Sequence, residues 1–293
     1  MILIDTNQCM ISNLMMQLKL DKNKLDENLV RHMVLNTIKS YKKRFSYEYG
    51  ELVFCYDSKH YWRKEIFPFY KQNRKKDREQ SELNWNDIFE CLNKIRDEIR
   101  ENFPYKVMEV HGAEADDIIA VLCKQQALKN IKLQKLNKEP EKVLVLSGDK
   151  DFIQLKKYPF VHQYNPTQKK FIEEIDPVLY IKEHIIKGDR SDGIPNFLSD
   201  DDTFVSGKRQ KPMSKKSLEK WIHSEPSSFM NDVQLKNYKR NQVLVDLDYI
   251  PENIQDKILT EFDQLNTHEK KTVNLNYFIN NKLFSLMNEL ENF

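Results

Sequence analysis

Three short apolar runs in this sequence each lead into an aspartate, and this pattern constrains the fold more than any other feature. The runs are residues 2–4 before Asp5, residues 51–56 before Asp57, and residues 143–146, which a Ser-Gly pair separates from Asp149. Short apolar runs separated by longer stretches of helical periodicity are typical of buried parallel strands. The sequence therefore predicts an α/β fold with a mostly parallel central sheet flanked by helices.

Other acidic motifs lie close to further predicted elements. A fourth strand is expected over residues 105–110, and helices are expected near residues 25–45 and 83–103. The carboxyl ends of parallel strands meet at one edge of a sheet, and the first turn of a helix favours acids. One such acid is usually a turn or cap residue, but three at strand ends favour a shared site. The candidate metal ligands are Asp5, Asp57, Glu114, Asp116, Asp117, Asp149, Asp151, Asp189 and Asp192.

Nine carboxylates in one place repel one another unless cations neutralise them or their pKa values rise. Oxygen ligands suit hard ions such as Mg²⁺ or Mn²⁺, and the seven histidines show no paired spacing typical of zinc. Two such ions are the usual requirement for in-line hydrolysis of a phosphodiester. The sequence predicts a phosphodiesterase that uses two Mg²⁺ ions, for which Mn²⁺ can substitute.

A basic segment lies between the second and third acidic motifs. Residues 59–78 contain eight basic and two acidic residues, although the whole chain has a net charge of only +2. Without the nine candidate acids, the basic residues of the chain outnumber the acidic ones by eleven. A charge run alone is most often a solvated helix face, but beside an acidic site it indicates contact with a polyanion such as nucleic acid.

The composition excludes several classes of protein. The four cysteines form no C-x-x-C pair, which indicates a reducing compartment rather than a disulfide-linked secreted protein. The longest apolar stretch, residues 118–123, is too short to cross a bilayer. We expect a cytoplasmic protein without a membrane partner.

The chain resembles the flap-endonuclease-like 5′ nuclease family nearly from end to end. The resemblance is carried by residues 30–36, 61–63, 69–71 with Arg74, 114–122, 187–189 with Asp192, and 244–251. It implies a first metal site at Asp5, Asp57, Asp116 and Asp149, with Glu114 close by. It implies a second metal site at Asp151, Asp189 and Asp192, with Asp117 near and Asp149 between the two sites.

The resemblance also gives the basic segment a role. Residues 59–80 would form a helical bridge over the active site, in which Lys71 and Arg74 reach the scissile phosphate and Tyr70 stacks on a base. The expected catalytic residues are Lys71, Arg74 and Asp149. The residues expected to bind nucleic acid are Arg63, Tyr70, Lys71, Arg74, Lys75, Lys215 and Lys216. We expect a mobile bridge, because its many like charges have no evident partner before phosphate binds.

The family further implies a domain organisation. Residues 1–185 would form the α/β nuclease core, and residues 186–293 a smaller helical region with a duplex-binding helix–loop–helix. The Gly-x-Gly turn of family members is missing, so residues 196–212 read as an inserted loop, and Ser214 is a plausible N-cap of the next helix. For the last six residues, disorder is the commoner outcome.

The implied activity is that of a metal-dependent 5′→3′ exonuclease with flap endonuclease activity on RNA–DNA and DNA–DNA duplexes. Such an enzyme would remove RNA primers during lagging-strand phage replication, in the cytoplasm of the host cell. A monomer is expected, and single-stranded-DNA-binding protein and a sliding clamp are its candidate partners.

Three other readings remain open from the sequence. A PIN-type endoribonuclease shares acids at strand ends, although such domains are usually shorter. A phosphatase of the haloacid dehalogenase type needs a second acid two residues after the first, where this chain has Asn7. A non-catalytic nucleic-acid binder would keep the acids for structure alone.

Overall fold

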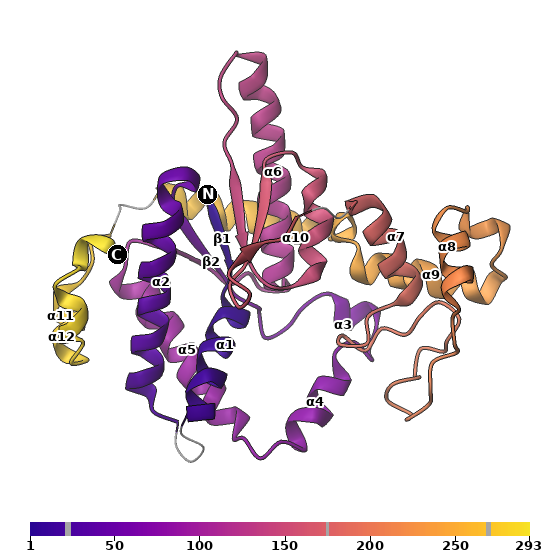
Figure 1. The fold of residues 1–293 in the computed structure, drawn as a ribbon, viewed down its shortest axis with the longest axis horizontal. Coiled ribbons are helices and arrows are strands. Elements are labelled where there is room, and N and C mark those ends of the chain that lie inside the picture. Colours follow the sequence, from indigo (N-terminus) through magenta and orange to yellow (C-terminus); the bar gives the residue numbers. More distant parts are fainter. Residues whose placement is uncertain (21–24, 174–175, 268–270) are drawn as a thin grey trace.

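The computed structural model describes residues 1–20, 25–173, 176–267 and 271–293 and contains one six-stranded sheet in these residues (Figure 1). The strands are β1 (Ile2–Asp5), β2 (Leu52–Cys55), β3 (Lys106–Met108), β4 (Val143–Leu146), β5 (Val161–Asn165) and β6 (Lys170–Phe171). Their order is β3-β2-β1-β4-β5-β6, and only β6 is antiparallel to its neighbour. The predicted α/β fold with a mostly parallel sheet is confirmed.

The order of the strands reverses at β1, which pairs with β2 on one side and with β4 on the other. At such a reversal the loops after neighbouring strands diverge and leave room for a ligand at the carboxyl end of the sheet. The three strands that run into aspartates are therefore the three at this point. The strands β5 and β6 were not predicted, because polar residues interrupt β5 and β6 has only two residues.

Helices cover both faces of the sheet. One face carries α1 (Thr6–Leu20), α2 (Glu27–Tyr49) and α5 (Trp85–Asn102), and the other carries α6 (Ala115–Lys135) and α10 (Glu252–Thr267). The alternation of β1 explains the two layers, because Ile2 and Ile4 pack into the first and Leu3 into the second. The helices expected near 25–45 and 83–103 are confirmed as α2 and α5, which begin after the N-caps Asp26 and Asn84.

The remaining elements lie around the carboxyl end of the sheet and beyond it. Figure 1 shows α6 projecting past the amino end of the sheet, whereas α3 (Arg63–Ile66) and α4 (Gln72–Glu79) lie beneath its carboxyl end. Further along the chain come the 3₁₀ helix η1 (Lys150–Lys157), α7 (Pro177–Lys187), α8 (Lys215–Ile222), η2 (Pro226–Ser228), α9 (Asp232–Val245) and η3 (Leu247–Tyr249). As predicted, Ser214 caps α8, and its Oγ accepts a hydrogen bond from Ser217 N at 3.0 Å. No helix of the described residues is long and apolar enough to cross a membrane.

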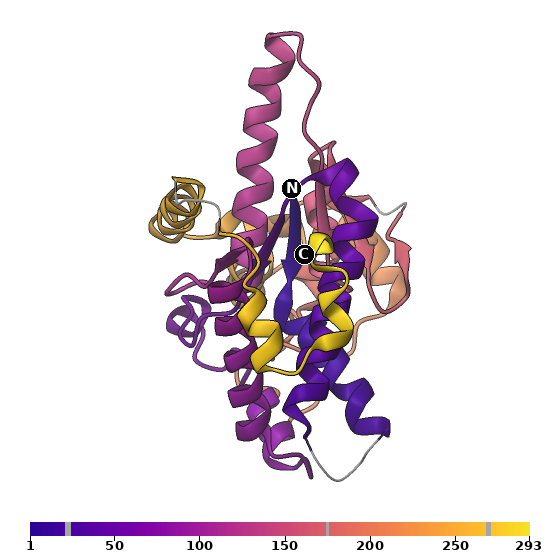
Figure 2. The same cartoon turned by 90° about the vertical axis from the view of Figure 1, so that its left-hand side faces the viewer.

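The last residues pack against the first helical layer instead of being disordered. They form α11 (Leu275–Asn280), α12 (Phe284–Met287) and η4 (Leu290–Asn292), which lie in front of the sheet in Figure 2. Phe293 is 1% exposed, and its ring contacts Phe103 and Phe278 at 5.5 Å between centroids. The expectation of a disordered tail is wrong, because an aromatic cluster buries the end of the chain.

We expect Phe293→Ala to lower the free energy of unfolding by about 3 kcal/mol, because it opens a cavity in this cluster. Phe284→Ala removes the same ring from a residue that is 60% exposed and should change the free energy by less than about 0.5 kcal/mol. Urea unfolding followed by circular dichroism measures both. Equal effects of the two variants would show that the tail does not stabilise the core.

Candidate active site

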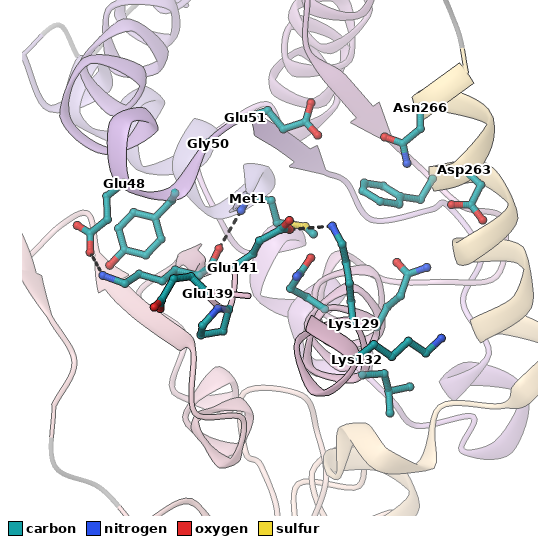
Figure 3. Close-up of a pocket in the computed structure, with 17 residues that line it drawn as sticks. Met1, Glu48, Gly50, Glu51, Lys129, Lys132, Glu139, Glu141, Asp263 and Asn266 are labelled. Atoms are coloured by element: carbon teal, nitrogen blue, oxygen red, sulfur yellow. Dashed lines mark hydrogen bonds and ion pairs between the residues drawn. The ribbon is translucent and has the colours of Figure 1, made fainter. Parts of the chain in front are cut away.

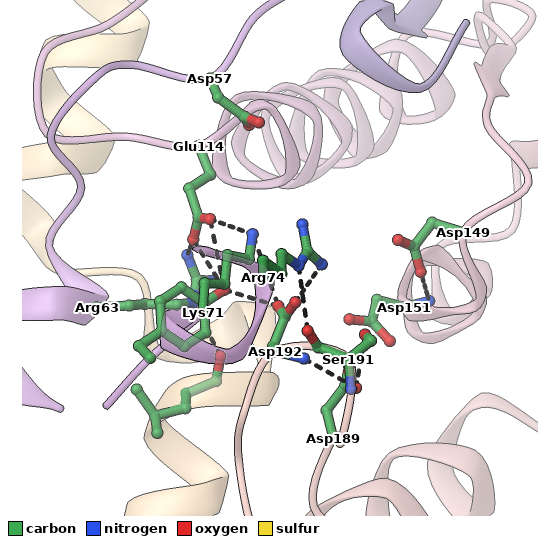
Figure 4. A network of polar contacts seen from close by, with 12 residues as sticks. Asp57, Arg63, Lys71, Arg74, Glu114, Asp149, Asp151, Asp189, Ser191 and Asp192 are labelled. Carbon is green, nitrogen blue, oxygen red and sulfur yellow. Dashed lines mark hydrogen bonds and ion pairs between the residues drawn. The ribbon is translucent and has the colours of Figure 1, made fainter. Parts of the chain in front are cut away.

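The carboxyl ends of β1, β2 and β4 bring Asp5, Asp57 and Asp149 to one edge of the sheet. The first turn of α6 adds Asp116, whose charge interacts with those of all three aspartates. Figure 4 shows Asp57 and Asp149 facing this edge from different elements. The structure thus brings together the four residues proposed for a first metal site, which we call the strand-end group.

Neutral donors fix the strand-end group. Asp5 accepts hydrogen bonds from Ser147 Oγ at 2.9 Å and from Gln8 N at 3.3 Å. Asp57 accepts one from Ala115 N at 2.8 Å, which ties the second strand end to the start of α6. Among the described residues, no basic side chain forms an ion pair within 4.0 Å with any member of the group.

The electrostatics of the group follow from this lack of basic partners. Burial and the charge of Asp57 raise the pKa of Asp5 to about 7. Burial and the charge of Asp151 raise the pKa of Asp149 to about 6, and burial and Asp149 raise that of Asp116 well above its ordinary value. Oxygen donors whose ionised forms repel one another are chemically suited to a hard divalent cation, so the residues present fit such an ion.

A second set of acids is neutralised by the protein itself. The guanidinium of Arg63, at the start of α3, lies 2.8 Å from both Glu114 Oε2 and Asp117 Oδ1. All three side chains are at most 3% exposed, and Trp62 Nε1 donates to Asp117 Oδ2 at 3.1 Å. Despite burial, Lys71 and Arg63 lower the pKa of Glu114. This buried network fastens the bridge to α6.

The other end of the bridge is held by Asp192. Arg74 forms an ion pair with Asp192, and Tyr70 donates its hydroxyl hydrogen to Asp192 Oδ2 at 2.9 Å. The ammonium of Lys71 lies 2.5 Å from Glu114 Oε1 and 3.6 Å from Asp192 Oδ2. Figure 4 shows Lys71 and Arg74 between these two acids, on the side of the site opposite Asp149 and Asp151.

These contacts bear on three expectations about the site. Arg63 and Tyr70 are 2% and 3% exposed and face acids, and their contact with nucleic acid stays a prediction. Asp117 lies 2.8 Å from the guanidinium of Arg63 and accepts a hydrogen bond from Trp62, and its role as a metal ligand also stays a prediction. Four basic residues of the bridge have acidic partners, so the reason given for its mobility does not hold for Arg63, Lys71, Arg74 and Lys75.

Two glycines allow the Asp189–Asp192 loop to reach the site. Gly188 has φ +66°, and an added Cβ would lie 2.4 Å from Ile194 O, so no other residue fits there without distortion. Gly193 has φ +74°, and its Cα faces the bridge so closely that a Cβ would lie 3.1 Å from Phe69 O. The loop carbonyl of Asp192 consequently accepts a hydrogen bond from Lys71 N at 2.8 Å.

A third set of acids contains a histidine that the sequence interpretation missed. His184 Nε2, in the last turn of α7, lies 3.2 Å from Asp151 Oδ1 and 3.8 Å from Asp189 Oδ2. Burial opposes the charged imidazole, but Asp151 and Asp189 raise the pKa of His184 above its ordinary value. The sequence search considered pairs of histidines, whereas the useful signal was a single histidine one helical turn before Gly188.

Neutral residues that support the site were also missed. The side chain of Gln8 accepts hydrogen bonds from Gly148 N at 2.5 Å and Ser147 Oγ at 3.1 Å. Gln163 Nε2 donates to the carbonyls of Ser147 and Asp149 at 3.1 and 2.5 Å. Isolated glutamines carry no recognisable motif, so the sequence offered no signal for them.

The remaining basic residues predicted to bind nucleic acid lie on the surface. Lys75, in α4, has a side chain that is 83% exposed and lies 3.9 Å from Glu79. Lys215 and Lys216 are exposed in the first turn of α8. All three are accessible to a phosphate backbone.

A separate hollow of about 950 Å³ lies at the amino ends of the strands, near Met1 and Glu51 (Figure 3). Four of its charged residues are paired within the protein, since Lys142 lies 2.5 Å from Glu48 and Lys129 lies 2.8 Å from Glu141. The acidic motifs lie at the opposite end of the sheet, which makes that end the candidate active site.

We expect Arg63→Ala to lower the free energy of unfolding by about 3–5 kcal/mol, because it leaves the buried Asp117 without its cation and Glu114 with Lys71 alone. Lys75→Ala also removes a basic residue of the bridge, but an exposed one, and should cost less than about 0.5 kcal/mol. Chemical unfolding of both variants at neutral pH checks this. A loss for Arg63→Ala no larger than that for Lys75→Ala would contradict the structural role of the network.

The raised pKa of Asp5 predicts a pH-dependent effect on stability in protein treated with EDTA. Folding disfavours the ionised carboxylate of Asp5. This residue therefore does not destabilise wild type below about pH 4, and it destabilises wild type increasingly as the pH rises to about 7. We expect the stability of Asp5→Asn relative to wild type to grow by about 3 kcal/mol between pH 4 and pH 8. Thermal unfolding across this range measures the difference.

Asp256→Asn makes the same change at an exposed aspartate and provides the matched control. A pH dependence of Asp5→Asn no larger than that of Asp256→Asn would mean that Asp5 is ionised in the folded protein at little cost. Adding divalent metal at pH 8 should reduce the advantage of Asp5→Asn, because the ion favours the carboxylate.

Comparisons with known proteins agree with this geometry. Residues 1–183 match the family described as the 5′-3′ exonuclease, N-terminal resolvase-like domain, and residues 174–293 match that described as T4 RNase H, C terminal. Ribonuclease H of Enterobacteria phage T4 is 34% identical over 99% of this chain and 95% of its own length. A 5′-3′ exonuclease of Buchnera aphidicola is 30% identical over 55% of this chain and about half of its own length.

Solved structures share the fold at lower identity. A flap endonuclease of bacteriophage T5, solved as a pseudo-enzyme–product complex with DNA and metal ions, aligns with a TM-score of 0.61 at 19% identity. That alignment covers 91% of this chain and 99% of the T5 chain. The T5 5′-exonuclease with bound zinc ions aligns with a TM-score of 0.60 at 19% identity, over 90% of this chain and 97% of the T5 chain. The chain therefore belongs to the 5′-3′ exonuclease family of nucleases, and its C-terminal part is of the T4 ribonuclease H type.

Proposed function

We propose that this 5′ nuclease hydrolyses phosphodiester bonds at the 5′ ends of RNA–DNA and DNA–DNA duplexes, as an exonuclease and as a flap endonuclease. In phage replication it would remove RNA primers from the lagging strand. One observation carries the proposal: within the described residues the strand-end group forms no ion pair within 4.0 Å, and it faces Lys71 and Arg74 across the site. The carboxylates that would bind metal ions and the basic side chains that would bind the phosphate thus lie on opposite sides of one site.

We assign the first ion to the strand-end group and the second to Asp151 and Asp189, with Asp149 between them. Mg²⁺ is the proposed ion and Mn²⁺ its substitute, because most of the donors are carboxylate oxygens. The bound ions would supply an activated water and stabilise the charge of the leaving oxygen. Asp192 is proposed to lie beside the second ion, held in position by Arg74 and Tyr70.

Lys71 and Arg74 are proposed to bind the scissile phosphate. Both side chains already lie within contact of acids, so a phosphate entering the site competes with Glu114 and Asp192 for them. The backbone of Lys71 adopts φ 57° and ψ 16°, and its N–H is bonded to Asp192 O. A lysine whose backbone is fixed in this way presents its ammonium to the phosphate with little further loss of conformational entropy.

The nucleic acid is proposed to continue from the site over two exposed surfaces. Lys75 on α4 would contact the 5′ strand, and Lys215 and Lys216 at the start of α8 would contact the duplex backbone. We propose residues 1–185 as the nuclease core, with the bridge at 59–80, and residues 186–293 as the helical region that holds the duplex. We further propose that the protein is a monomer in the host cytoplasm and that it binds single-stranded-DNA-binding protein and a sliding clamp.

A nuclease assay with Mg²⁺ tests the proposal on a 5′-RNA-primed DNA duplex, a 5′-flap duplex and bare single strands. We expect cleavage at 5′ ends, a loss of turnover of at least about 100-fold in Asp149→Asn, and a similar loss in Lys71→Ala. Asp149→Asn removes a proposed metal ligand, and Lys71→Ala removes a positive charge that would contact the phosphate. EDTA should abolish cleavage by wild type.

Lys64→Ala is the matched control for Lys71→Ala, because Lys64 is an exposed lysine of the same bridge. Its turnover should stay within about threefold of wild type. Near-normal turnover of Asp149→Asn would refute the two-ion site. Strong cleavage of single-stranded RNA without a 5′ end or duplex would favour a PIN-type endoribonuclease instead.

A further inference from the structure

One nitrogen donor lies among the oxygen donors of the site. His184 Nε2 and one carboxylate oxygen each from Asp151 and Asp189 all lie within 4.8 Å of one another. The three residues come from separate elements, the end of α7, the start of η1 and the loop after Gly188. This convergence is produced by tertiary structure and not by local sequence.

The imidazole is held in this position from two sides. The ring of Tyr180, one turn earlier in α7, stacks on it with 5.7 Å between centroids and 19° between planes. The backbone carbonyl of His184 accepts the N–H of Gly188, which fixes the helix end beneath the ring. The side chain is only 16% exposed, so it is not free to turn into solvent.

The atom that faces the two aspartates is His184 Nε2, which is shielded from solvent. Asp151 and Asp189 lie near it among the described residues, and neither contact has the geometry of a hydrogen bond. Its separation of 3.2 Å from Asp151 matches that of neighbouring ligands on a shared ion, whereas its separation of 3.8 Å from Asp189 is longer. Donors about 2.1 Å from a metal are about 3.0–3.4 Å apart in octahedral or tetrahedral arrangements.

We propose that His184 is a direct ligand of the second ion, together with Asp151 and Asp189, and that this site prefers Mn²⁺ to Mg²⁺. Imidazole nitrogen binds Mn²⁺ and later transition metals better than it binds Mg²⁺, which prefers oxygen and keeps its water. The strand-end group contains only oxygen donors and would have no such preference. The inference rests on the proposed two-ion function, which it deepens by making the two positions chemically different.

The direct test is pulsed electron paramagnetic resonance of Mn²⁺ added to the full chain at pH 8. We expect electron spin-echo modulation from a directly bound ¹⁴N in wild type and its loss in His184→Gln. Calorimetric titration of the same proteins should show Mn²⁺ affinity at the second site at least about 10-fold weaker in His184→Gln, and Mg²⁺ affinity within about threefold of wild type.

Two variants keep the result interpretable. His223→Gln makes the same change at an exposed histidine of the C-terminal region and should retain the ¹⁴N modulation. His184→Asp offers oxygen in place of nitrogen and should bind Mg²⁺ at least as well as wild type, without ¹⁴N modulation. If His184→Gln is misfolded by circular dichroism, the comparison of His184→Asp with wild type decides the question.

The outcomes separate this inference from the proposed nuclease activity. Two bound Mn²⁺ ions without ¹⁴N modulation in wild type would overturn the ligand assignment, even if cleavage at 5′ ends is normal. Retained modulation in His184→Gln would overturn it as well. Modulation that disappears with His184, in a protein that cleaves no 5′-ended substrate, would support the ligand and refute the proposed function.

Discussion

The architecture of the site depends on one buried contact, the guanidinium of Arg63 between Glu114 and Asp117. It joins the bridge to the first turn of α6, and so to the strand ends on which the other acids lie. A buried arginine with two carboxylates adds little net stability compared with an apolar core, but it fixes one relative position of the two elements. Lys71 and Arg74 owe their position over the carboxylates to this attachment and to Asp192 at the other end of the bridge.

The acids of the site consequently fall into sets with different electrostatic situations. Glu114, Asp117 and Asp192 form ion pairs with cations of the bridge, whereas the strand-end group forms none within 4.0 Å among the described residues. This division explains why burial raises the pKa of Asp5 to about 7 while the pKa of Glu114 falls. Carboxylates that still repel one another in the folded protein indicate a site for a ligand of opposite charge, which would remove the repulsion.

Sequence reasoning identified the acids of the site, but not which of them pair with basic side chains and which do not. Asp5, Asp57 and Asp149 were recognisable because each follows an apolar run, and in a parallel sheet all such runs end at the same edge. The roles of Arg63 and Tyr70 were not recognisable, since the sequence of a basic, aromatic segment does not reveal which side chains point inward. His184 was missed because one histidine in a helix has no signature until two separate acids are placed beside it.

By itself, the sequence determined the α/β fold, the central strands, the edge at which a site forms and the acidic chemistry of that site. These properties follow from local periodicity and from residues adjacent to strand ends, which a chain displays directly. Only the tertiary structure decided which acids are paired with Arg63, Lys71 and Arg74, that His184 joins Asp151 and Asp189, and that Phe293 is buried. Those outcomes depend on contacts between residues far apart in the chain, where packing and electrostatic balance select partners that local sequence cannot specify.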